Sequence, residues 1–69
     1  MSKANRVMVM FKGPSGVVRA WASGPASDEQ EVREVAIGKL SEYRKEKASL
    51  GDEYMATCDY TESTIGYVQ

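Results

Sequence analysis

The segment from Ser27 to Gly51 constrains the fold most, because its pattern is that of one long amphipathic helix. Its apolar residues recur at helical spacing and fall on one side of a 3.6-residue wheel: Val32, Val35, Ala36, Leu40, Tyr43 and Leu50. Ser27 with Gln30 predicts an N-terminal capping box, and Gly51 predicts the left-handed residue that ends a helix. Such a helix would be roughly 34 Å long. It is longer than a typical strand, so we expect one end to extend past any sheet it covers.

Two strand-like segments precede the helix and form a predicted hairpin. Residues 6–12 and 16–23 are rich in apolar residues, and the turn residues Gly13-Pro14-Ser15-Gly16 separate them. A turn that sets Lys12 opposite Val17 gives a core face made of Val7, Val9, Phe11, Val18, Ala20 and Ala22. The other face, called the outer face, then carries Arg6, Met8, Met10, Lys12, Val17, Arg19 and Trp21.

The residues after the helix predict a second pair of strands. Residues 53–60 alternate, with the inward positions at Tyr54, Ala56, Cys58 and Tyr60. Residues 61–64 predict a turn, and residues 65–69 a short last strand with Ile65 and Tyr67 also facing inward. The predicted fold is therefore α+β with the order β-β-α-β-β. One long helix packs on one face of a four-stranded antiparallel sheet of strand order 2-1-3-4. The alternative is β-β-α-β with an irregular C-terminus.

The composition predicts one globular domain, residues 1–69, with a flexible N-terminus at residues 1–5. Hydrophobic residues make up 42% of the chain and charged residues 28%, which is typical of a folded domain. A chain of this length buries only ~60% of its unfolded surface, so its core is thin and a second copy would supplement it. There is no apolar run of membrane-spanning length and no signal-peptide pattern. The sequence therefore predicts a soluble, cytoplasmic protein with no membrane partner.

The residues that common catalytic and metal sites need are missing from the sequence. The chain has no histidine and one cysteine, Cys58. This excludes an intrachain disulfide, a cysteine–histidine zinc site and histidine-dependent nucleophilic catalysis. Cys58 lies on the predicted core face, where cysteine behaves as a small hydrophobic residue. The turn at residues 13–16 lacks the Lys-Ser/Thr and the following helix of a phosphate-binding loop. We therefore predict a protein that is not an enzyme and holds no cofactor and no metal.

The outer face is the strongest candidate for a binding surface. Exposed methionine and tryptophan mark interaction sites, and tryptophan and arginine are common interface anchors. The predicted partner-binding residues are Arg6, Met8, Met10, Lys12, Val17, Arg19, Trp21 and, from the third predicted strand, Met55. The alternative interpretation is that a shifted register or the C-terminal residues cover this face.

A net charge of −1 hides an uneven distribution along the chain. Residues 1–25 carry four bases and no acid (+4), whereas residues 26–69 carry five bases and ten acids (−5). We predict a small protein-binding module, an adaptor or an inhibitor, as a phage-encoded protein that blocks a host machine would be. It would dock on a larger protein, or on a second copy, through the outer face or an edge strand. The alternative is a single-stranded nucleic-acid-binding protein that uses Trp21 and the basic N-terminal hairpin, which the pI of 5.3 disfavours.

Overall fold

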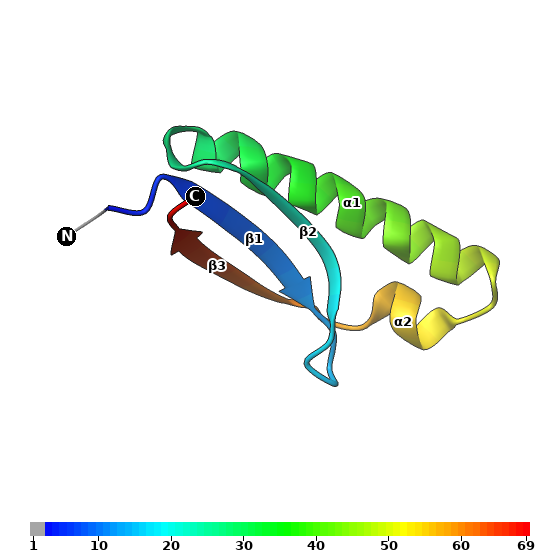
Figure 1. The fold of residues 1–69 in the computed structure, drawn as a ribbon. Helices are drawn as coiled ribbons and strands as arrows, with labels where there is room; N and C mark the ends of the chain where they lie inside the picture. The colour runs from blue at the N-terminus through cyan, green and yellow to red at the C-terminus, as the bar shows by residue number, and fades with distance from the viewer. Residues whose placement is uncertain (1–2) are drawn as a thin grey trace.

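The computed structural model has three antiparallel strands in one sheet and a long helix against one face of it (Figure 1). The structure describes residues 3–69. In the sheet order β2-β1-β3, the strands are β1 (Arg6–Lys12), β2 (Val18–Pro25) and β3 (Thr61–Tyr67). Between β2 and β3 lie a 3-10 turn, η1 (Ala26–Asp28), the long helix α1 (Glu29–Ser49) and the short helix α2 (Glu53–Thr57). The predicted four-stranded sheet is therefore wrong.

The segment after the long helix departs most from the prediction. Residues 53–57, predicted to begin a strand, form α2, because Asp52 caps them by accepting a hydrogen bond from the Met55 N–H at 3.1 Å. Residues 61–64, predicted as a turn, form the first half of β3, which pairs with the whole of β1. The element order β-β-α-β is that of the alternative prediction. Its irregular C-terminus is wrong, however, because the C-terminal residues form the third strand.

The β1–β2 hairpin has the predicted turn but a different register. The Gly13 N–H donates to the Val17 carbonyl at 3.0 Å, and Gly16 takes a φ of 83°. An irregularity in the ladder then pairs Lys12 with Val18 but Phe11 with Ala20. From Phe11 onward the pairing is displaced by two residues, which keeps side chains on their predicted faces. Val18 is the exception: predicted in the core, it is 37% exposed.

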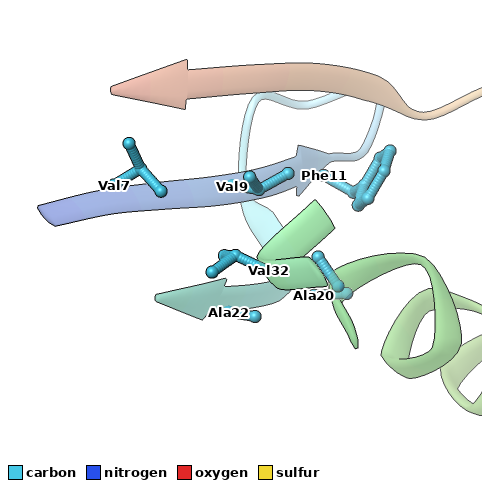
Figure 2. Close-up of a cluster of buried hydrophobic side chains, with 7 residues drawn as sticks. Val7, Val9, Phe11, Ala20, Ala22 and Val32 are labelled. Atoms are coloured by element: carbon cyan, nitrogen blue, oxygen red, sulfur yellow. The ribbon is translucent and has the colours of Figure 1, made fainter. Parts of the chain in front are cut away.

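The core lies between β1, β2 and the N-terminal half of α1, as Figure 2 shows. Its buried members are Val7, Val9, Phe11, Ala20, Ala22, Val32 and Ala36. Gly24, opposite Val7, is also buried, and a Cβ placed on it would lie 2.7 Å from Val32 Cγ2. The absence of a side chain at Gly24 therefore lets the helix approach β2 closely.

Helix α1 confirms the predicted C-terminus but not the predicted N-terminus. The Gly51 N–H donates to the Ala48 carbonyl at 3.1 Å, the next N–H donates to the Lys47 carbonyl at 2.9 Å, and Gly51 has a φ of 82°. Ser27 lies in η1, and the N-cap residue is Asp28, which makes no side-chain capping hydrogen bond. The predicted capping box is therefore wrong.

The buried stripe of α1 is narrower than predicted. Val32 and Ala36 are buried, whereas Val35 is 49% and Leu50 69% exposed. Helix α1 packs mainly on β1 and β2 and reaches β3 through Arg33 and Glu62, and its C-terminal half extends past the strands, as predicted (Figure 1). This overhang makes the molecule elongated. Its radius of gyration is 13.5 Å, whereas a compact domain of this length has one of about 11 Å.

Helix α2 packs beneath this overhang through a corner cluster of Tyr43, Arg44, Cys58 and Tyr60. Arg44 Nη1 donates to the carbonyls of Ala56 at 3.0 Å and of Cys58 at 2.9 Å. Its guanidinium also lies 4.6 Å from the centre of the Tyr60 ring, which meets Tyr43 edge-on at 6.1 Å. Cys58 is thus a half-buried residue at the end of α2 and not, as predicted, a core residue of a strand.

Tyr60 makes the stability of this corner sensitive to alkaline pH. Burial, followed by contact with Cys58, raises the pKa of Tyr60 from 10.0 to about 12. When a group has a higher pKa in the folded state than in the unfolded state, its contribution to stability is fully present at pH values below the unfolded-state pKa. That contribution is lost as the pH rises through the folded-state pKa. We expect the urea midpoint to fall between pH 10 and pH 12, with a smaller fall in Tyr60→Phe. Tyr54→Phe, at a 64% exposed position, should follow the wild type. An equal pH dependence in Tyr60→Phe would contradict the assignment.

Asn5 joins the start of β1 to the chain at the ends of both edge strands, β2 and β3. The Asn5 N–H donates to the Tyr67 carbonyl at 3.1 Å, its carbonyl accepts from the Ala26 N–H at 2.9 Å, and its side-chain oxygen accepts from the Gln69 N–H at 3.0 Å.

Of the segment 1–5 predicted to be flexible, residues 1–2 lie outside the described residues. Among residues 3–69, no helix has the length and apolar character to cross a membrane.

Candidate binding surface

The outer face of the sheet, which points away from α1, arranges its side chains in rows across three strands. Strand pairing sets these rows as Arg6 with Tyr67, Met8 between Ser23 and Ile65, Met10 between Trp21 and Ser63, and Lys12 between Val18 and Thr61. Helix α1 packs on β1 and β2 from the opposite side. Within residues 3–69, no helix or strand is layered over the outer face.

An apolar strip crosses the outer face from one edge strand to the other. It consists of Trp21 on β2, Met10 and Met8 on β1, and Ile65 on β3. Trp21 is 48% and Ile65 46% exposed, while the two methionines between them are half-buried. The two ends of the strip are therefore open to a partner. The methionine side chains at its centre are flexible and can adapt to a partner of irregular shape.

Trp21 lies where the outer face meets the free edge of β2. Lys39, an exposed residue of α1, places its Nζ 5.4 Å from the centre of the indole ring. The helix therefore holds one side of Trp21 while about half of its surface stays in solvent. The sequence did not single out Lys39, because a contact between residues 21 and 39 depends on where the helix crosses the sheet.

The outer face carries positive charge and no acid. Its cations are Arg6 and Lys12, which are half-buried on β1, whereas Arg19 is exposed at the irregularity in β2 and lies by Gly13, beside this face. The one acidic residue of the three strands, Glu62, pairs opposite Phe11 on the helix side of the sheet. There its Oε1 accepts from Nε of Arg33 at 2.6 Å. The basic character predicted from residues 1–25 is thus concentrated on one side of the sheet.

Tyr67 lies on the outer face, although its sequence pattern predicted that it faces inward. The prediction paired residues 65–69 with residues 53–60, which turned Ile65 and Tyr67 inward. Pairing of β3 with β1 instead sets Tyr67 opposite Arg6 and Ile65 opposite Met8. Interaction with the Arg6 guanidinium, followed by Ser23, lowers the pKa of Tyr67 below its usual 10.0. No local signal marked this residue, because its face depends on a partner strand far away in the sequence.

The structure brings most of the predicted binding residues together. Arg6, Met8, Met10, Lys12 and Trp21 share the outer face, as their strand pairing requires. Val17, just before β2, and Arg19, at the irregularity in β2, are exposed beside it. Met55 is not part of the surface, because it lies in α2, where its carbonyl accepts a hydrogen bond from the Tyr60 hydroxyl. The C-terminal residues extend the sheet at its edge and do not fold over it.

No protein-family model, curated protein or solved structure matches the chain. Within residues 3–69, no group of three or more histidine, cysteine, aspartate or glutamate side chains is placed to hold a metal ion. A function for the protein therefore has to be argued from the geometry and charge of its own surfaces.

Proposed function

We propose that the protein is a small protein-binding module that docks through its outer face onto a larger protein. One observation supports this most directly: Trp21 and Ile65 expose nearly half of their surface at the two ends of a continuous apolar strip. Exposed apolar patches with a polar rim are typical of interaction sites, and a partly held tryptophan is a common anchor. The protein would act as an adaptor or an inhibitor, by occupying a surface of its partner.

The charges around the strip define the partner that fits. Arg6 and Lys12 border the apolar strip without any acid between them. A complementary surface would offer an apolar patch flanked by aspartate or glutamate, which favours encounter and correct orientation. The same charges oppose a symmetric dimer through this face, because a two-fold axis would bring the two cations of one copy close to those of the other.

Single-stranded nucleic acid is a second candidate, favoured by the position of Tyr67. Two aromatic residues, Trp21 and Tyr67, now lie on one acid-free face with Arg6 and Lys12. Sheets that bind single strands stack bases on such aromatics and hold phosphates with the cations. Met8 and Met10 separate the two rings, however, and the apolar strip between them suits a protein surface better than a run of bases.

Trp21→Ala is expected to leave the fold intact and to weaken docking. Trp21 is 48% exposed and outside the buried core, so circular dichroism and the melting temperature should change little. The affinity for the protein captured from an extract of the cells that make the chain should fall by about 30-fold or more. This is the effect of removing a typical hot-spot residue. Tyr54→Ala, at an exposed position of α2, should bind as the wild type does. Equal losses in both variants would contradict outer-face docking.

A titration of the single tryptophan decides between the two candidates. Random single-stranded RNA or DNA is added to the protein at low and at moderate salt, and Trp21 emission is followed. Emission that does not respond supports the protein-binding proposal. Quenching that weakens as salt increases would show a nucleic-acid platform and would overturn that proposal in favour of the second candidate.

A further inference from the structure

A groove runs between the free edge of β2 and the N-terminal half of α1. It encloses a cavity of about 220 Å³, lined by residues 22–25 of β2 and by Asp28, Glu31, Val32 and Val35 of α1 and the turn before it. Small-molecule pockets usually start near 300 Å³. The groove is therefore sized for one or two side chains of a longer ligand.

The strand that forms one wall of this groove has an unpaired edge. β2 is the outermost strand, and its only ladder partner is β1. Within residues 3–69, residues 20–24 make no backbone hydrogen bond outside that ladder. An open strand edge is a template on which an extended chain adds as a further strand, held by main-chain hydrogen bonds. The backbone of the groove thus favours an extended peptide over a folded or cyclic ligand.

The side chains of the groove define what that peptide should carry. Its apolar wall is Val32, which is buried, and Val35, which is 49% exposed. Its acidic wall is Asp28 and Glu31, and neither forms an ion pair among the described residues. An apolar side chain would fill the cavity against the valines. A lysine or arginine two residues away, which points to the same side of an extended strand, would meet the carboxylates.

We propose that the β2–α1 groove binds an extended peptide segment with an apolar and a basic side chain, added to β2 as a fourth strand. Neither Trp21 nor Ile65 lines this groove, so it is a second interaction surface. The two surfaces carry opposite charges, because the groove is acidic and the outer face is basic. The segment it takes therefore differs in chemistry from the acidic partner proposed for the outer face.

The test uses two capped synthetic peptides, Thr-Val-Thr-Lys-Thr and Thr-Val-Thr-Glu-Thr, with isotope-labelled full-length protein. We expect the lysine peptide to shift the amide signals of residues 20–24 and 28–35 and to slow hydrogen exchange along β2. The glutamate peptide should bind about fivefold more weakly, the size of one exposed ion pair. Glu31→Lys should remove this preference, whereas Glu34→Lys, on the same helix but outside the groove, should keep it.

Four outcomes would overturn the proposal. These are no binding at millimolar peptide, equal binding of the two peptides, exchange protection at residues 61–67 of β3 in place of β2, and β2 protection that rises with protein concentration without peptide. The last would show that a second copy pairs with the edge. A lysine peptide methylated on its backbone nitrogens is expected to lose binding, because strand addition needs those donors. None of these results alters the outer-face proposal, whose Trp21→Ala and Tyr54→Ala comparison measures a separate surface.

Discussion

Ala36→Asp is expected to unfold the protein at room temperature. Ala36 is fully buried at the centre of the α1 stripe, packed with the core residues of β1 and β2. A carboxylate there would lose its water without gaining a partner, at a cost of several kcal/mol. A domain of this size has a total stability of about 3 to 10 kcal/mol, so the cost is comparable to the whole. The helical circular-dichroism signal and the cooperative thermal transition should both be lost.

Ile37→Asp is the matched control for this substitution. It introduces the same charge one residue further along α1, at a position that is 42% exposed. Its helical signal should be retained, and its melting temperature should change by a few degrees at most. If the two variants behaved alike, either both folded or both unfolded, α1 would not pack on the sheet through Ala36.

Gly24→Ala is expected to lower the free energy of unfolding by about 1 to 3 kcal/mol, the usual range for overpacking. The new Cβ would lie 2.7 Å from Val32 Cγ2, well inside van der Waals contact. Valine is stiff about its first side-chain torsion, so it cannot turn away without moving the helix. Alanine would also reduce the freedom of the unfolded chain, but that gain of about 0.4–1 kcal/mol is smaller than the strain. Thermal or urea unfolding measures the difference.

A double-mutant cycle isolates the contact between Gly24 and Val32. Val32→Ala removes the clashing methyl group, so the double variant should lose less stability than the two single variants added together, by about 1 kcal/mol. Gly38→Ala is the control, because a Cβ at Gly38 meets nothing within 4 Å and glycine is unfavourable inside a helix. It should raise the free energy of unfolding by roughly 0.5–1 kcal/mol. Strictly additive effects at Gly24 and Val32 would contradict the close approach.

The hairpin and the long helix could be predicted because their signals are local. Alternation in residues 6–12 gave the faces of β1 correctly, and Gly13 to Gly16 gave the turn. A two-residue displacement in the pairing left those faces unchanged, since side chains alternate with a period of two. Gly51 gave the end of the helix for the same local reason. The narrow buried stripe of α1 was not predictable, because it depends on how few strands lie beneath the helix.

The sequence placed the outer-face residues of β1 and β2 that the proposed binding surface uses, but not those of β3. Met8, Met10 and Trp21 follow from alternation within the hairpin. Ile65 and Tyr67 reach the outer face only through pairing with β1. The acidic groove beside β2 also could not be seen, because it joins residues 22–25 to Val32 and Val35 across the helix–sheet contact.

By itself, the sequence determined one long helix, the hairpin before it, the faces of the β1 side chains and the basic character of the first 25 residues. Each of these depends on neighbours along the chain, whose spacing fixes them before any packing occurs. Only the tertiary structure decided that residues 53–57 become a helix beneath the overhang of α1 and that β3 takes the open side of β1. Residues 53–60 alternate as a strand would, but a strand needs a free edge beside it, and residues 53–57 pack against α1 and not along the free edge of β2. β1 has one such edge, and residues 61–67 occupy it.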